Sequence, residues 1–169
     1  RDGLMLGICN GFQVLIKLGL VPYGDIVPMT AECPTLTFNT IGRHQSRLVR
    51  TRVASNLSPW LAKTEVGDMH TIAISHGEGR FVASDDVLAQ LKANGQIATQ
   101  YVDEAGVPGM DLDVNPNGSL LAIEGITSPD GRVFGKMGHS ERYSNGTFVN
   151  VPGVKDQPLF AAGVEYFAA

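Results

Sequence analysis

The stretch Leu4-Met5-Leu6-Gly7-Ile8-Cys9-Asn10-Gly11-Phe12-Gln13 combines an apolar run of strand length with a cysteine between two glycines. We interpret residues 3–8 as a fully buried strand of a parallel sheet. Residues 11–19, whose apolar side chains recur at helical spacing, are interpreted as the helix that follows. Cys9 would then lie in the tight turn of a nucleophile elbow, where flanking glycines accommodate a strained central residue.

The start of a helix also favours the reactive form of this cysteine. Free backbone amides and the helix dipole stabilise negative charge there, and so favour a thiolate. The alternative is an inert thiol buried in a core strand, which is the usual situation for a lone cysteine. Gly7 and Gly11, two residues before and after Cys9, favour a chemical role.

Composition narrows the class of protein. The 169 residues, 43% of them hydrophobic, suffice for one domain with a real core. A net charge of −4 gives no general attraction to nucleic acid or to anionic membranes, and no apolar run is long enough to cross a bilayer. Two cysteines, Cys9 and Cys33, cannot form a disulfide framework, and no signal peptide is evident, so we expect a cytoplasmic protein.

The position of the elbow within the chain is unusual. A central parallel strand needs neighbours already in place, so an α/β domain rarely begins within a residue or two of its catalytic strand. We therefore expect residues 1–169 to be an N-terminally truncated α/β domain that lacks its first strands.

The remaining pattern alternates strands and helices. A turn at Ser128-Pro129-Asp130-Gly131 predicts a hairpin between the strands that flank it. Ser84 and Gly95 mark the two ends of a helix over 85–93. Strands are expected at 35–39, 47–54, 71–75, 96–102, 120–126 and 133–137, a helical turn at 57–61 and a last helix at 157–167.

Several polar residues permit two interpretations. His44 with Arg43, Arg47, Arg50 and Arg52 forms either an anion-binding patch or a solvated strand face. Cys33 has no partner at metal-ligand spacing, so we expect no metal site.

A cysteine nucleophile in acyl transfer needs a base, and the base needs an acceptor that orients it. His139 and Glu141 follow the second hairpin strand and provide both groups within three residues. A parallel sheet could bring this strand end back to the elbow. The alternative is a surface-loop histidine beside a solvated glutamate.

These residues resemble the class I (triad) glutamine amidotransferases, which are marked by Gly-x-Cys-x-Gly-x-Gln and a distant His-x-Glu. Here the two motifs are Gly7 to Gln13 and His139-Ser140-Glu141. Further segments are similar to the glutaminase domains of phosphoribosylformylglycinamidine synthases, and together they cover nearly the whole chain: Ser75 to Phe81, Asn115 to Ser119, Gly131 to Val133, and Asn39 with Gly42-Arg43.

The resemblance implies a fold and an activity. The fold is an α/β three-layer sandwich with a central, mostly parallel, flavodoxin-like sheet, and residues 1–169 form one glutaminase domain. The activity is hydrolysis of glutamine to glutamate and ammonia through a cysteine thioester. The ammonia would pass to a synthase domain or subunit that converts formylglycinamide ribonucleotide to formylglycinamidine ribonucleotide in purine biosynthesis. ATP and Mg²⁺ belong to that synthase, and no cofactor is expected in this domain.

The resemblance also implies roles for individual residues. Cys9 attacks the side-chain amide of glutamine, His139 protonates the leaving ammonia and then activates water, and Glu141 orients His139. The backbone amide of Asn10 donates to the oxyanion.

Three further positions match the family near its glutamine pocket. Gln13, Ser75 and His76 are the expected substrate-binding residues, with the Ser75-His76 segment at the amino-acid end of glutamine. For His76 the alternative is a loop histidine whose hydrogen bonds are satisfied within the protein.

The sequence departs from the family at two points. The family more often has Pro-His-Pro-Glu-Arg where this chain has Gly138-His139-Ser140-Glu141-Arg142, so the segment lacks the rigidity of proline. The family's second oxyanion donor comes from a glycine-rich loop after an earlier strand, which this sequence does not contain. Losing one such donor typically costs about 10²–10³ in rate, so we expect low activity from the fragment alone.

Two other functions share the elbow. A DJ-1-like cysteine hydrolase has the same strand-to-helix cysteine but does not need a His-x-Glu segment. A non-catalytic docking fragment would retain the elbow without turnover. The position of His139 relative to Cys9 discriminates the first of these from a glutaminase.

Overall fold

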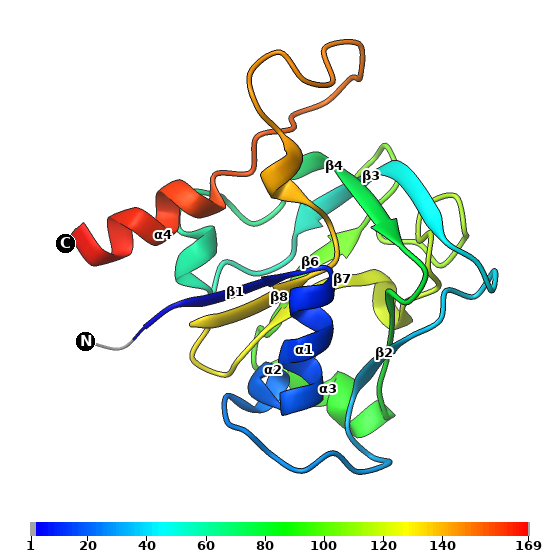
Figure 1. Cartoon of the computed structure of the whole chain (residues 1–169), viewed down its shortest axis with the longest axis vertical. Coiled ribbons are helices and arrows are strands. Elements are labelled where there is room, and N and C mark those ends of the chain that lie inside the picture. Colours follow the sequence, from blue (N-terminus) through cyan, green and yellow to red (C-terminus); the bar gives the residue numbers. More distant parts are fainter. Residues whose placement is uncertain (1–2, 169) are drawn as a thin grey trace.

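A curled six-stranded sheet organises the computed structural model, which describes residues 3–168 (Figure 1). The strand order is β1-β8-β7-β6-β3-β4, and β2 pairs with β5 in a separate small sheet. The strands are β1 Met5–Ile8, β2 Thr35–Thr37, β3 Gln45–Val53, β4 Met69–His76, β5 Arg80–Val82, β6 Ile97–Tyr101, β7 Ile123–Thr127 and β8 Val133–Lys136. The helices are α1 Asn10–Leu18, α2 Leu20–Tyr23, α3 Asp85–Ala93 and α4 Leu159–Ala168, with 3₁₀ turns η1 Pro59–Leu61, η2 Leu120–Ala122 and η3 Ser140–Arg142.

The α/β class is confirmed, but the strands run differently from the expectation. Among the described strands only β1 and β8 pair in parallel, and the other pairings are antiparallel. The sheet of residues 3–168 is therefore mixed and not mostly parallel. Short connections such as the turn at 128–132 between β7 and β8 can join only antiparallel strands, whereas parallel strands need a long crossover.

The first strand also differs from the expectation. Within residues 3–168, β1 has β8 as its one neighbour and lies at the edge of the sheet. The side chain of Met5 is 46% exposed, so β1 is not fully buried as predicted. An edge strand is covered on fewer sides than a central one, which explains the exposure.

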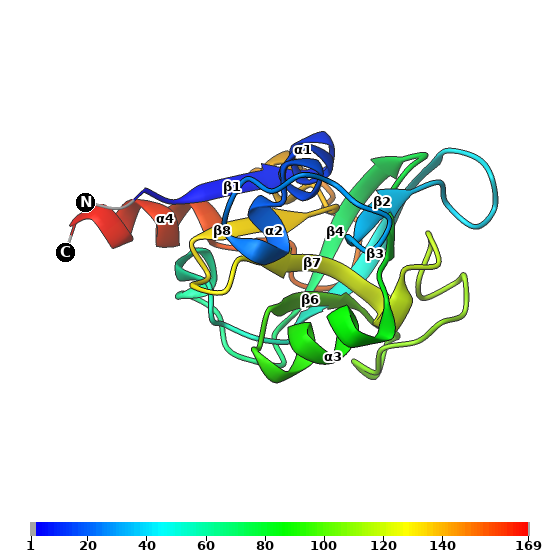
Figure 2. The ribbon, with the colours of Figure 1, turned by 90° about the horizontal axis from the view of Figure 1, so that it is seen from below.

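Helices cover both faces of the sheet and make three layers. One apolar core joins α1, α2 and α3 to one face, and a second core joins η1 and α4 to the other through Leu61, Phe134 and Leu159. In Figure 1, α1, α2 and α3 lie below the sheet and α4 lies above it. Figure 2 shows the curl, because β3 and β4 run steeply across the direction of β1 and β8.

Helix α1 packs directly on the two parallel strands. Its buried side chains include Phe12 and Leu15. A Cβ at Gly135 would lie 2.2 Å from Phe12 Cδ2, and one at Gly7 would lie 2.5 Å from Leu15 Cδ1, so glycine is required at both positions. A Cβ at Gly11 would meet no described atom within 4 Å, so of the two glycines that flank Cys9 only Gly7 is required by packing.

The local signals for helix ends and turns are confirmed. Helix α3 has the predicted bounds, with the Ser84 hydroxyl accepting from the Val87 amide at 3.4 Å. The hairpin of β7 and β8 is present, with Gly131 at φ 73° in its turn. The expected strand at 120–126 begins instead with the turn η2, where Leu121 and Ala122 have positive φ.

None of the helices described between residues 3 and 168 has the length and apolar character needed to cross a membrane.

Candidate active site

Cys9 joins β1 to α1 in a conformation that few residues other than glycine adopt. Its φ is 53° and its ψ is −104°. The turn is fixed on both sides, because the Cys9 amide donates to the carbonyl of Lys136 at 2.8 Å and the Cys9 carbonyl accepts from the Gln13 amide at 3.1 Å. Positive φ in a non-glycine residue is strained and occurs at functional sites. The predicted elbow is therefore present.

The thiol of Cys9 is half-buried and points toward the end of β4. Its Sγ lies 3.7 Å from the carbonyl oxygen of Ser75. Burial raises the pKa of Cys9 above its ordinary value of 9.0, and the opposing effect of the Asn10 amide is smaller. The helix start favours the thiolate as expected, through the Asn10 amide, but burial outweighs this effect in the resting protein. The thiol needs a base to become a nucleophile.

His139 reaches the same edge of the sheet as Cys9. The parallel pairing of β1 with β8 sends the ends of both strands in one direction. The His139 amide donates to the carbonyl of Ala73 at 2.8 Å, while Cys9 contacts Ser75, two residues further along β4. Positions two residues apart on a strand lie about 7 Å apart and face the same side. Strand β4 therefore contacts both Cys9 and His139 and holds them close to each other.

Glu141 holds the other side of the imidazole. His139 Nδ1 and Glu141 Oε1 are 2.5 Å apart, with Glu141 supplied by η3. The His139 side chain is only 11% exposed, and its Nε2 has no hydrogen-bond partner within residues 3–168. A carboxylate on Nδ1 leaves Nε2 available to accept a proton, as a general base requires.

A pocket of about 380 Å³ opens beside the thiol. Its walls include four of the residues predicted from the sequence, and they come from α1, β4 and the loops that follow β2 and β4. The lining residues are Cys9, Gln13, His44, Ser75, His76, Gly77 and Glu78. His139 and Glu141 are outside this lining, and Asn10, the first residue of α1, is exposed.

Asn39 does not line the pocket but holds the pocket residue His76 in place. Its side-chain amide donates to the carbonyls of His76 at 2.8 Å and Arg43 at 3.0 Å. Its Oδ1 lies 3.2 Å from His76 Nδ1 and accepts from the Gly79 amide at 3.3 Å. Burial lowers the pKa of His76 to about 4, so the ring is neutral at physiological pH. Asn39 braces the turn at 77–79 through the Gly79 amide, while His76 Nε2 has no partner in the described part of the chain.

Two other side chains shape the rim. Gln13 Nε2 donates to the carbonyl of Glu78 at 2.6 Å, which ties α1 to the loop after β4. His44 Nε2 lies 3.1 Å from the Ser75 hydroxyl. The pocket is thus built by contacts between three segments that are far apart in the chain.

Comparison with known proteins decides the family. Residues 1–167 match the CobB/CobQ-like glutamine amidotransferase domain. The chain belongs to this glutamine amidotransferase family. The chain is 39% identical to the phosphoribosylformylglycinamidine synthase subunit PurQ of Aquifex aeolicus over 140 residues, covering 83% of this chain and 56% of that protein. It is 37% identical to the subunit of the same name from Synechococcus elongatus over 170 residues, covering 99% of this chain and 64% of the relative.

A solved structure agrees with these relatives. The structure of PurLQS from Thermotoga maritima superposes with a TM-score of 0.69 and 30% identity, covering 97% of this chain and 62% of that one. This amidotransferase chain therefore spans less than two thirds of the length of the relatives it matches.

Sequence reasoning missed several residues of this amidotransferase site. His44 and Glu78 both line the pocket, but the sequence pattern places His44 beside the arginines and indicates no role for Glu78. Glu124 and Lys136 lie in strands that were judged only by their apolar pattern. The missed signal was one acid and one base inside two otherwise apolar strands of a predicted hairpin.

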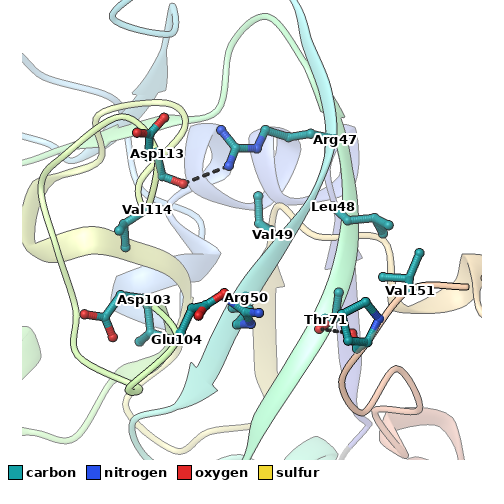
Figure 3. A pocket seen from close by; sticks show the side chains of 12 residues that line it. Arg47, Leu48, Val49, Arg50, Thr71, Asp103, Glu104, Asp113, Val114 and Val151 are labelled. Atoms are coloured by element: carbon teal, nitrogen blue, oxygen red, sulfur yellow. Dashed lines mark hydrogen bonds and ion pairs between the residues drawn. The ribbon is translucent and has the colours of Figure 1, made fainter.

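The arginines of β3 lie on a solvated strand face, because Arg47 is exposed and Arg50 and Arg52 are half-buried. Two of them, Arg47 and Arg50, line a second pocket of about 370 Å³ against the loop at 103–114 (Figure 3). Arg50 Nη1 lies 3.0 Å from Glu104 Oε1, and Arg47 Nη2 donates to the carbonyl of Asp113 at 2.8 Å. These contacts use the arginine charges to hold the loop. Across residues 3–168, no three His, Cys, Asp or Glu side chains are grouped to hold a metal ion.

Proposed function

We propose that this domain hydrolyses glutamine to glutamate and ammonia through a thioester on Cys9, with His139 and Glu141 as the other members of a catalytic triad. The observation that carries the proposal is the shared sheet edge: parallel strands β1 and β8 deliver the strained cysteine and the Glu141-bound imidazole to neighbouring positions on β4. Family membership favours this activity over a DJ-1-like hydrolase.

The geometry supports a two-step mechanism. His139 Nε2 takes the proton of the Cys9 thiol, and the thiolate attacks the side-chain carbonyl carbon of glutamine. The backbone amide of Asn10 donates to the oxyanion that forms. His139 returns the proton to the departing nitrogen, which leaves as ammonia, and a γ-glutamyl thioester remains. His139 then takes a proton from water, the resulting hydroxide attacks the thioester, and glutamate and the free thiol are released.

Glutamine would occupy the pocket beside the thiol. Gln13, Ser75 and His76 are the proposed contacts, and the unpartnered Nε2 of His76 is suited to a neutral hydrogen bond. Because His76 is uncharged at neutral pH, it does not act as a cation for the substrate carboxylate.

The ammonia has a proposed destination. The relatives are named as subunits of phosphoribosylformylglycinamidine synthase, and the structural neighbour is titled PurLQS. We extend this to the present domain: ammonia would pass to a synthase domain or subunit that converts formylglycinamide ribonucleotide to formylglycinamidine ribonucleotide. ATP and Mg²⁺ would be used there, in the cytoplasm. Residues 1–169 would be the glutaminase domain of that assembly.

A labelling experiment tests the activity. The full-length protein that contains residues 1–169 is treated with an electrophilic glutamine analogue. The modified peptide is then identified by mass spectrometry. Modification of Cys9 that glutamine suppresses, and that Cys9→Ser abolishes, is the expected result. Cys33→Ser is the matched control and retains labelling. Glutamine-protected modification of another residue would contradict the proposal.

A further inference from the structure

Two opposite charges are completely buried beneath the segment that carries the proposed base. Glu124 on β7 and Lys136 on β8 both have 0% exposed side chains, and Lys136 Nζ lies 3.4 Å from Glu124 Oε1. Glu124 Oε2 also accepts a hydrogen bond from the Thr99 hydroxyl on β6. Lys136 is the last residue of β8, which leads into residues 138–141, and Glu124 lies near the start of the antiparallel β7, at the same end of the hairpin.

The pair contacts the residues on both sides of His139. Before it, the Gly138 amide donates to Glu124 Oε1 at 2.5 Å, and the Gly138 carbonyl accepts from Lys136 Nζ at 2.9 Å. After it, the Ser140 hydroxyl accepts from Lys136 Nζ at 3.0 Å and donates to Gln157 Oε1 at 2.6 Å. The chain is therefore held by the Gly138 backbone immediately before the imidazole and by the Ser140 hydroxyl immediately after it.

These contacts need the two residues that distinguish this segment. Proline at 138 would have no amide hydrogen to donate to Glu124, and proline at 140 would have no hydroxyl for Lys136. A Cβ at 138 would lie 2.9 Å from Glu124 Oε1 and 2.9 Å from Ile72 Cγ2, so glycine permits the close approach. The segment is thus held by hydrogen bonds, and the expected loss of rigidity does not follow from the missing prolines.

Stability alone does not account for a buried ion pair. Removing two charges from water is costly, and well-packed apolar residues often serve as well or better. Burial lowers the pKa of Lys136, and the Glu124 carboxylate opposes this shift. Apolar residues at positions 124 and 136 could not form the three hydrogen bonds that this pair makes with Gly138 and Ser140.

We infer that Glu124 and Lys136 are positioning residues, which fix the backbone on both sides of His139 and so aim its imidazole and Glu141 at Cys9. The inference rests on the proposed function, because His139 is the base of that reaction. Neither residue touches the substrate pocket.

The test removes both charges together. Glu124→Ala or Lys136→Met alone leaves one uncompensated buried charge and is expected to unfold the protein. The double variant Glu124→Ala/Lys136→Met leaves no unpaired charge and is expected to fold. Its kcat for glutamine hydrolysis should fall by about tenfold to a hundredfold, the size of effect that misplacing a catalytic group by about 1 Å produces. Its KM should stay within twofold, because the pocket lining is unchanged.

A milder test compares Ser140→Ala with a matched control, Ser128→Ala. Ser140→Ala removes the hydroxyl that Lys136 contacts, and Ser128→Ala removes a buried hydroxyl at the far end of the same hairpin. Both should lower the melting temperature, but only Ser140→Ala should lower kcat. A folded double variant with wild-type kcat would overturn the inference, as would wild-type kcat in Ser140→Ala.

A readout independent of turnover separates this inference from the proposed function. The His139 Nδ1 proton that is shared with Glu141 should give a downfield NMR resonance in the wild type, and this resonance should be lost or shifted in the double variant. If the wild type neither hydrolyses glutamine nor is labelled at Cys9, the proposed function fails. The NMR resonance then decides the positioning role, and an unchanged resonance in the double variant overturns it.

Discussion

The backbone amide of Cys9 donates to the carbonyl of Lys136 at 2.8 Å, which continues the parallel pairing of β1 and β8 by one residue into the elbow. This bond fixes the nucleophile to the strand that also leads to His139. The register between two strands at opposite ends of the sequence therefore sets the geometry of the site.

Removing the carboxylate of Glu141 should impair turnover without unfolding the protein. Glu141→Gln replaces the charged acceptor beside His139 Nδ1 with an amide that can also donate to this nitrogen, so the imidazole no longer holds one tautomer. We expect kcat to fall by about 10²–10⁴-fold. Steady-state kinetics measure the loss, and Glu165→Gln, an exposed carboxylate on α4, is the control. Activity equal to wild type in Glu141→Gln would exclude Glu141 from the triad.

The two glycines of the elbow should respond differently to alanine. Gly7→Ala forces a methyl group to 2.5 Å from Leu15 Cδ1 and 2.7 Å from the backbone carbon of Gly11, and should destabilise the fold by about 1–3 kcal/mol. Gly11→Ala meets open space in a helix and should leave stability unchanged or raise it by up to about 1 kcal/mol. Denaturant unfolding of both variants compares them, and equal losses would contradict the packing of α1 on β1.

His76 should make stability depend on pH. Its pKa is about 4 in the folded protein and 6.5 ordinarily, because burial disfavours the charged ring. Between these values the unfolded chain binds more protons than the folded one, so stability is full above about pH 6.5 and is lost as the pH falls toward 4. The loss is about 3 kcal/mol.

Chemical denaturation at several pH values measures this slope. His76→Asn has no titrating ring, so its stability should change less over the same interval. A slope that is the same in the variant and the wild type would show that other groups cause the dependence.

Cys33, which has no proposed catalytic role, should react with an alkylating reagent faster than the proposed nucleophile Cys9. Burial raises the pKa of Cys9, whereas hydrogen bonds from Thr30 lower the pKa of the partly exposed Cys33. Without glutamine at pH 7–8, iodoacetamide should therefore modify Cys33 faster than Cys9. Peptide mapping over time gives both rates. Faster modification of Cys9 would show that its thiolate is already formed in the resting protein.

The sequence predicted the features that local signals determine. The elbow depends on a cysteine between glycines, and α3 begins and ends where Ser84 and Gly95 indicate. The sequence predicts strands at 133–137 and 71–75 because their apolar runs are short and bounded by turns. Each of these depends on residues close together in the chain.

The features that were missed depend on contacts between distant segments. The mixed sheet arises from the order in which the strands pair, which alternation of apolar residues does not reveal. Asn39 and His76 are far apart in the chain, and their side chains meet only in the folded state. Glu124 and Lys136 are charged residues in strands whose apolar neighbours dominate the pattern, so their pairing required the register of β7 on β8.

The central claim is that Cys9 forms a thioester with the glutamyl group. The most direct measurement is acid quenching during glutamine turnover, followed by mass spectrometry of the peptide that contains residues 4–17. The account predicts a glutamyl adduct on Cys9 that is absent from Cys9→Ser. Turnover of glutamine without this adduct, or with the adduct on another residue, would contradict it.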